Sequence, residues 1–588
     1  DYLGRIYASL GETQKALALY NQSLPLSRAV SNRSGEAKTL ANIGTLLNPQ
    51  QPEVSIVFYK QSVNLYETLR QAIRQLPREI QETYTKSVAK TYRALADSLI
   101  AQGRIGEAQQ VLERLKIQEL NDFTKGTRAP ATIADVGFNP IETQIKGKYT
   151  SLIAFGGKFY ECEQQRCPQY SELKTQYENL SKEFQVFVEQ IKQQLHDGRL
   201  TQVNTSTQDF QNSADRIVTA HPNSILIYPL VLADKTRILW AFKGGVLSKT
   251  AICPLGETAL YNKVAQFQKL ISQRHDETEL KAVGKELYDC LIKPLEGELT
   301  ANQIQHLIFV PDRATNYIPM GALFDGKQYL IQRFAVSNIL SAGLTDTDDR
   351  LQSLQQTPVL ALGLTQAKGN FGALPNVASE LSAIVKRVGG TGIYPGDTYL
   401  DQAFTKSVLE DNLRGHRIIH IATHGEFKPT NPRDSYFLLG TGTPYPIPDV
   451  QNLRDLKDVH LVVLSACQTG LGGADGLGLE VSGMSSFFMG DRTRAKAVLA
   501  SLWQVNDAST GLLMQQFYQN LARGTMSKVE ALRQAQLAMI QDKRMGAEGN
   551  RGSFIITTTN PDGQTQTIDR NFSHPYYWAP FILIGNSL

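Results

Sequence analysis

The sequence is poor in cysteine, nearly balanced in charge, and free of long hydrophobic runs. Five cysteines in 588 residues, an odd number, argue against a disulfide framework and favour a reducing compartment, which predicts a cytoplasmic protein. A net charge of +4 gives no case for binding nucleic acid or an anionic membrane. No apolar stretch approaches the ~18 residues that span a bilayer. What is left is a globular protein without membrane or nucleic-acid signals.

The length exceeds what one hydrophobic core can organise, so we expect three or four domains. The chain opens on Asp1 within a helical pattern and without an initiator Met. We therefore expect it to be a fragment of a longer protein, in which a targeting segment would not be visible.

Residues 1–123 carry a repeated pattern of small and aromatic residues. Gly4 and Tyr20 recur as Gly44 and Tyr59, about 40 residues later, and a third copy lies at an offset of 92. Small residues let paired helices approach closely, and aromatic residues fill the layer between pairs. The pattern resembles tetratricopeptide repeats, with a longer period and an interruption at 48–52. A plain helical bundle is the alternative, whereas a solenoid implies a concave surface that binds a protein partner.

Within residues 124–223 we expect a linker over 124–145, followed by a helical hairpin. Apolar residues recur every three or four positions between Leu173 and Leu195, which predicts a long amphipathic helix. Cys162 and Cys167 precede it without two further ligands at zinc-binding spacing. We therefore expect two ordinary cysteines or a local disulfide there.

From residue 224 the pattern changes to α/β. Two strands joined as a hairpin open a first half over 224–345, and strands alternate with helices through a second half over 346–588. Such alternation predicts a mainly parallel sheet with helices on both faces. Within the second half we expect a helix over 399–413 and a long exposed insertion over 543–573.

Two predicted strands of the second half end at reactive side chains. The stretch 417–426 ends in Thr-His424-Gly425-Glu, and the stretch 460–470 ends in Ser-Ala-Cys467-Gln-Thr-Gly. Because parallel sheets place their chemistry at the carboxyl ends of strands, His424 and Cys467 can lie side by side. A thiol with a neighbouring imidazole is the minimum for a nucleophile and its base.

Each residue also has a plainer interpretation. Cys467 alone is most simply a buried structural cysteine, and His420, four residues before His424, is most simply a core histidine with its hydrogen bonds satisfied. The occurrence of His-Gly after one strand and Ala-Cys-Gln-x-Gly after another favours a catalytic pair for His424 and Cys467.

These two stretches resemble the signature motifs of CHAT-domain proteases, which share the caspase-like fold with separases, legumains and gingipains. Further stretches agree with the resemblance over 224–588. They are Pro311-Asp312 with Tyr317-Ile-Pro319, Ala500-Ser-Leu-Trp503 with Asp507, and His574-Pro-Tyr-Tyr-Trp-Ala-Pro. By analogy with separases, 224–345 is an inactive half that packs on a catalytic half, 346–588.

The resemblance implies a regulated cysteine endopeptidase. Cys467 would attack the peptide carbonyl, His424 would protonate the leaving amine, and the N–H groups of Gly425 and Cys467 would bind the oxyanion. No metal or cofactor is needed, and a backbone carbonyl can orient the imidazole in place of a third side chain. The repeats in front would recruit the substrate or a regulatory protein.

The resemblance also implies cleavage after Arg or Lys. Asp507 stands 40 residues after Cys467, at the place where separases carry the acid of the S1 pocket. Bidentate pairing with that carboxylate would favour Arg. A helix N-cap at Asp507 is the plainer alternative, and Asp475 and Glu480 are competing S1 candidates. The Gly-rich loop 470–478 is expected to be mobile and to order on activation.

Two other functions stay open. A catalytically silent scaffold would keep the fold for interaction or signalling alone, and an esterase or acyltransferase would use the same thiol. No Gly-x-Ser-x-Gly elbow is present, which ranks that last possibility lowest.

Overall fold

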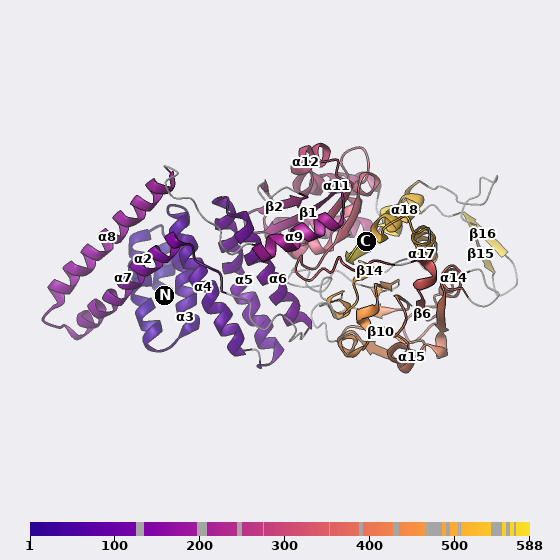
Figure 1. Ribbon diagram of the computed structural model, residues 1–588, viewed down its shortest axis with the longest axis horizontal. Coiled ribbons are helices and arrows are strands. Elements are labelled where there is room, and N and C mark those ends of the chain that lie inside the picture. The colour runs from indigo at the N-terminus through magenta and orange to yellow at the C-terminus, as the bar shows by residue number, and fades with distance from the viewer. Residues whose placement is uncertain are drawn as a thin grey trace. The chain divides into compact units, whose positions relative to one another are not determined.

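The computed structural model describes two compact units, residues 1–212 and 213–588. Figure 1 shows both along the chain. The described residues are 1–73, 75–124, 135–196, 208–243, 250–274, 276–351, 353–386, 392–426, 428, 434–465, 467–468, 485–489, 494–503, 505, 507–541, 555–559, 565–569 and 572–588. For a few of them, Cys467 and Gln468 included, the description covers the backbone alone.

The first unit begins with three antiparallel helix pairs. They are α1 (Tyr2–Ser9) with α2 (Thr13–Ala29), α3 (Arg33–Leu47) with α4 (Pro52–Ile73), and α5 (Arg78–Ala101) with α6 (Ile105–Thr124). A Cβ atom on Gly4 would lie 2.5 Å from the Tyr20 ring, and one on Gly44 would lie 2.9 Å from the Tyr59 ring. The repeated glycine and tyrosine therefore form the same contact in two successive pairs, which confirms the predicted repeat. Of residues 48–52, predicted to interrupt it, 48–51 form the turn between α3 and α4, and Pro52 begins α4.

A helical hairpin completes this unit. Helices α7 (Pro140–Gln165) and α8 (Tyr170–His196) lie against each other (Figure 1). A capping box between Asn139 and Glu142 starts α7, so helix begins before the end of the predicted linker. The α8 stripe, including Tyr177 and Phe184, packs on the core that the repeat helices share with α7.

The second unit is built on an eleven-stranded sheet of order β3-β2-β1-β4-β5-β17-β14-β12-β8-β6-β7. The strands are β1 (Ser224–Val231), β2 (Thr236–Phe242), β3 (Thr250–Cys253), β4 (His306–Phe309), β5 (Ala335–Asn338), β6 (Val359–Gly363), β7 (Gly396–Leu400), β8 (Ile418–Ala422), β12 (Leu461–Leu464), β14 (Ala497–Ser501) and β17 (Phe581–Gly585). Seven of the ten neighbouring pairs are parallel, as predicted.

The two halves of this sheet run in opposite directions. The last strand, β17, is parallel to β5 but antiparallel to β14. Strands β1, β4 and β5 therefore point one way, and β6, β7, β8, β12 and β14 point the other. The carboxyl ends of the two sets lie at opposite edges of the sheet, a consequence that strand-by-strand sequence patterns do not contain.

Both faces of the sheet are covered. One face forms a single core with residues of α10 (Glu257–Ser272), α11 (Glu277–Leu291), α14 (Val377–Ile384), α17 (Asp507–Ala522) and α18 (Lys528–Ile540). On the other face Ile419 and Ile421 are buried as well. There His221, which follows α9 (Gln208–Ala220), packs edge-on against His306 of β4. Burial on both sides explains why these strands read as continuous apolar runs.

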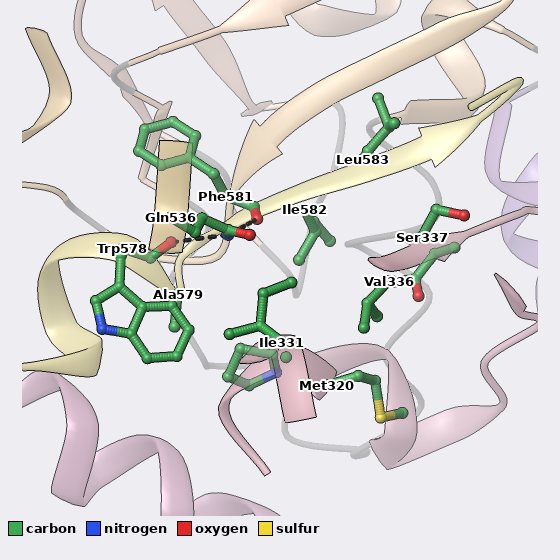
Figure 2. Close-up of a pocket in the computed structure, with 13 residues that line it drawn as sticks. Met320, Ile331, Val336, Ser337, Gln536, Trp578, Ala579, Phe581, Ile582 and Leu583 are labelled. Atoms are coloured by element: carbon green, nitrogen blue, oxygen red, sulfur yellow. Dashed lines mark hydrogen bonds between the residues drawn. The ribbon is translucent and has the colours of Figure 1, made fainter. Parts of the chain in front are cut away.

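The seam between the halves is narrow. Strands β17 and β5 pair at Ile584 and Asn338, and beside that point lies a cavity of about 20 Å³. Figure 2 shows Gln536 of α18 reaching into this region, where its Nε2 donates to the carbonyl oxygens of Trp578 (2.9 Å) and Phe581 (3.3 Å). The cavity lining includes Pro319 and residues 578–579, which belong to two of the family-like stretches. Those stretches therefore help to close the seam between the halves.

Two expectations from sequence are corrected, and the structure adds detail to a third. Four of the five cysteines form disulfides, Cys162–Cys167 and Cys253–Cys290, so the argument from cysteine to a reducing compartment fails. The predicted helix over 399–413 is instead the end of β7 followed by α15 (Lys406–Asp411). The predicted insertion over 543–573 contains the hairpin β15 (Ile555–Thr559) and β16 (Thr565–Asp569).

Candidate active site

Four loops meet at one edge of the second half. They follow β6, β8, β12 and β14, which are parallel neighbours in the order β14-β12-β8-β6. The loop after β8 carries His424, the one after β12 leads to Cys467, and the one after β14 leads to Asp507. The loop after β6 carries residues that sequence reasoning did not select. This is the edge at which open α/β sheets place their ligands.

His424 is held by the loop after β6. Its Nε2 lies 2.7 Å from the carbonyl oxygen of Gly372, and the residue is only 7% exposed to solvent. Because a carbonyl oxygen can only accept, Nε2 carries the proton and Nδ1 carries the lone pair of the neutral ring. Among the described residues no hydrogen bond reaches Nδ1. The imidazole is thus set to act as a base through Nδ1.

The loop that supplies Gly372 is fixed at its base and its tip. Thr365 donates its N–H and its hydroxyl to the Asp401 carboxylate, at 2.8 and 2.7 Å. Lys368 and Phe371 exchange backbone hydrogen bonds of 3.1 and 3.0 Å. Phe371 then stacks on the His424 ring, with centroids 4.9 Å apart. Asn370-Phe-Gly-Ala, a glycine-bearing turn after a buried strand, was the sequence signal for this loop.

Backbone pairing brings Cys467 beside Gly425. A second, four-stranded sheet has the order β11-β10-β9-β13, where β9 is Gly425–Glu426, β10 is Tyr436–Leu438, β11 is Pro444–Pro446 and β13 is Cys467–Gln468. Strands β9 and β13 are parallel, with Cys467 opposite Gly425. Adjacent strands lie about 4.8 Å apart. The backbone of Cys467 is therefore an immediate neighbour of the residue that follows His424.

The direction of the Gly425 N–H follows from the pairing on its other side. The His424 carbonyl accepts the Leu438 N–H at 2.8 Å and so points toward β10. In a trans peptide the next N–H points the opposite way, and the described residues contain no cis peptide. The Gly425 N–H therefore points toward β13, the side on which Cys467 lies.

Asp507 is the first residue of α17 and is half-buried. Its Oδ2 accepts both the backbone N–H (2.9 Å) and the side-chain Nδ2 (2.7 Å) of Asn376, which precedes α14. Burial raises the pKa of the Asp507 carboxyl, and the hydrogen bonds from Asn376 and the nearby imidazole of His424 oppose that shift. Asp507 thus lies within electrostatic range of His424, and it also ties two helix starts together.

The other two S1 candidates, Asp475 and Glu480, lie outside the described residues, as does the predicted mobile loop 470–478. The side chain of Cys467 is also outside the description. Since the other four cysteines are paired, Cys467 has no further cysteine in the chain with which to form a disulfide.

His420 is a core residue, as its plainer interpretation held. It is fully buried, and its Nε2 lies 2.8 Å from Glu380 Oε1 while its Nδ1 lies 3.1 Å from the Tyr518 hydroxyl. Both ring nitrogens are committed, which leaves none for chemistry. The network connects α14, β8 and α17, the elements next to Asn376, His424 and Asp507.

Within the described ranges no group of three or more His, Cys, Asp or Glu side chains is arranged to hold a metal ion. The described helices also include none that is both long enough and apolar enough to cross a membrane.

Comparison with known proteins identifies the family to which the chain belongs. The family model of the CHAT domain matches residues 281–586, more than half of the chain. Tetratricopeptide repeat protein 28 of Mus musculus is 22% identical over 377 residues, which are 54% of this chain and 14% of that protein. The chain thus spans about a seventh of the length of this relative.

Some solved structures show similarity to the chain. The Arg-specific cysteine proteinase gingipain R has a TM-score of 0.31 at 11% identity, over 56% of this chain and 74% of that one. A chain of the Saccharomyces cerevisiae separase–securin complex has a TM-score of 0.40 at 9% identity, over 100% of this chain and 48% of that one. These scores are too low to transfer a function.

Proposed function

This chain belongs to the CHAT-domain family, and from that premise we propose that it is a cysteine endopeptidase with Cys467 as nucleophile and His424 as base. The observation that carries the proposal is the pairing of Cys467 with Gly425, directly after a histidine whose Nε2 is bound to a carbonyl. A nucleophile beside an oriented base is the arrangement that thiol catalysis requires.

The steps follow from the positions of these groups. His424 Nδ1 takes the Cys467 proton, and the sulfur forms a bond to the peptide carbonyl carbon. The carbonyl oxygen gains the electron pair and is bound by the N–H groups of Gly425 and Cys467. His424 then protonates the amine as the C–N bond breaks. Water attacks the thioester, giving the second product and restoring the thiol.

Asp507 is the proposed S1 acid. Its half-buried carboxylate lies near His424 at the same edge of the sheet, and the separation of 40 residues from Cys467 matches the separase pattern. A half-buried carboxylate attracts a basic P1 side chain more strongly than it would in open solvent. We therefore propose cleavage after Arg or Lys, with Asp475 and Glu480 as the other candidates.

The repeats are the proposed recruiting surface. Helix pairs that stack through small and aromatic residues present a continuous concave surface, which typically binds an extended protein segment. The proposed partner is a substrate protein or a regulatory protein of this endopeptidase.

One observation favours the alternative of a silent scaffold: Phe371 covers the His424 ring, which is buried. In an active enzyme this loop must make room for the substrate, whereas in a scaffold it need not move.

A peptide library incubated with the protein and with Cys467→Ala separates these functions. The endopeptidase predicts cleavage by the parent and none by the variant. The control is a Cys162→Ala/Cys167→Ala double variant. It removes the disulfide of the first unit and leaves Cys467, in the second unit, unchanged, so it should cleave as the parent does. Equal cleavage by the parent and Cys467→Ala would remove the dyad from the mechanism. No cleavage by either, together with no labelling of Cys467 by a thiol-directed peptide probe, would favour the scaffold.

A further inference from the structure

We propose that Asn376 is a positioning residue that leaves the Asp507 carboxylate one free oxygen, so that the pocket accepts a Lys and an Arg side chain about equally. The inference rests on the proposed function and sharpens it, because a free carboxylate would favour Arg through a bidentate pair.

Asn376 does not serve as an ordinary helix cap. It stands at the N-cap position of α14, yet its side chain makes no capping hydrogen bond. Two other N-cap asparagines of the chain do: Asn32 accepts from the Gly35 N–H, and Asn139 accepts from the Glu142 N–H. The Asn376 side chain instead donates to Asp507 across to α17. The side-chain cap that usually stabilises a helix start is therefore absent at the residue that binds the proposed S1 acid.

The two donors of Asn376 occupy one oxygen. Its N–H and Nδ2 lie 2.9 and 2.7 Å from Asp507 Oδ2, and a carboxylate oxygen has two lone-pair sites. Oδ1 makes no hydrogen bond among the described residues. A fork-to-fork guanidinium pair needs both oxygens, whereas an ammonium, or a single guanidinium N–H, needs one. The Asp507 carboxylate therefore offers a contact through one oxygen, which suits Lys as well as Arg.

Asn376 is itself held rigidly. Its carbonyl accepts the Glu380 N–H at 2.9 Å and the Ser379 hydroxyl at 2.8 Å, inside the first turn of α14. Glu380, one turn along, is bound to His420 of β8. The orientation of the Asp507 carboxylate is thus fixed relative to the strand that leads to His424.

Peptide binding tests this in the Cys467→Ala background, where no turnover interferes. Three labelled peptides differ at P1 alone, which is Arg, Lys or norleucine, and their Kd values are measured by fluorescence anisotropy. We expect the Arg and Lys peptides to agree within about threefold and to bind at least tenfold tighter than norleucine. Adding Asn376→Ala frees a lone pair of Oδ2, and the preference for Arg over Lys should rise about tenfold.

The matched control adds Asn139→Ala, which removes another N-cap asparagine and should leave the ratio unchanged. Three results would each overturn the inference. The first is a tenfold preference for the Arg peptide over the Lys peptide while Asn376 is still present. The others are an Arg-to-Lys ratio that does not change in Asn376→Ala, and a norleucine peptide that binds as tightly as the Arg and Lys peptides. Cleavage by the parent protein is scored separately, so the inference can fail while the endopeptidase stands.

Discussion

The two halves of the sheet contrast in what they do with the polar residue after a buried strand. In the first half, β4 is followed by Asp312, whose Oδ2 accepts the Val231 N–H at 2.9 Å and which caps the turn 313–317 together with Thr315. In the second half, β8 is followed by His424, which binds one carbonyl through one ring nitrogen. Asp312 therefore binds the backbone of its own half, whereas His424 keeps one basic ring nitrogen that makes no hydrogen bond among the described residues.

The contrast also has a spatial side. Because β4 and β8 run in opposite directions, Asp312 and His424 lie at opposite edges of the sheet. The first half therefore adds core and sheet area to the second, while none of its described strands ends at the candidate active site. The proposed catalysis depends on which side chains keep an atom that is not hydrogen-bonded to the backbone. The pattern of strands in the sequence does not reveal which side chains these are.

The largest expected effect is on catalysis by His424. His424→Ala should lower kcat/KM by about 10²–10⁴-fold, the usual contribution of a general base. Its free energy of unfolding should change little, because among the described residues the ring makes one hydrogen bond and one stacking contact, both at a loop. Steady-state kinetics and urea unfolding measure the two quantities. A loss of stability that matches the loss of rate would make His424 a structural residue.

The next largest effect is expected at His420, where substitution should lower stability more than activity. His420→Ala leaves the buried Glu380 carboxyl without its imidazole partner and should lower the free energy of unfolding by about 3 kcal/mol. Activity per folded molecule should fall far less than in His424→Ala. The outcome that contradicts the contrast is a His420 variant with full stability and no activity.

Acid should weaken both halves through buried histidines away from the site. Burial lowers the pKa of His221 to about 4, and burial aided by the charge of Lys528 lowers the pKa of His460 to about 2. The unfolded chain takes up these protons below about pH 6.5, so stability is present above that pH and is lost as pH falls toward 4. The slope reaches about 1.4 kcal/mol per pH unit for each histidine.

Thermal unfolding between pH 7.5 and 5.0 measures this loss, with His221→Gln as the matched variant. The variant should show a shallower decline than the parent. Parallel declines would mean that His221 does not titrate on unfolding.

The smallest effect is expected at Asp312. Asp312→Ala removes the acceptor of the Val231 N–H and the cap of the turn, which should cost about 1–2 kcal/mol of stability. Activity per folded molecule should be unchanged, since the residue lies at the opposite edge from His424. A selective loss of kcat in a folded Asp312→Ala protein would break the comparison between the halves.

The sequence predicted the parts of this molecule that depend on local pattern. The glycine and tyrosine spacing predicted the helix pairs, and the apolar runs before His424 and Cys467 predicted parallel strands. The register that sets Cys467 opposite Gly425 depends on pairing between distant segments, and the reversal at β17 depends on the last strand inserting between two halves. A backbone carbonyl acceptor for His424 was expected, but the sequence did not identify it as that of Gly372, because the contact depends on how the loop after β6 folds back onto β8.

Sequence reasoning was wrong about the cysteines and incomplete about Asp507, because proximity between distant segments decided both. An odd cysteine count suggested free thiols, yet Cys253 and Cys290 are brought together by β3 and α11 after 37 residues. Asp507 could be an S1 acid or a helix cap by sequence, and its bonds to Asn376 are a tie between helices that neither interpretation contained.

The most direct test of the central claim is the rate of Cys467 alkylation by iodoacetamide as a function of pH, in the parent and in His424→Ala. Because the other four cysteines are in disulfides, the reaction reports one thiol. An ordinary thiol becomes reactive near its pKa of about 8.5. The account predicts that Cys467 of the parent reacts with iodoacetamide at pH values well below about 8.5. In His424→Ala the pH profile of the reaction should shift up to about pH 8.5. Identical profiles for the two proteins would contradict a thiol and an imidazole that meet.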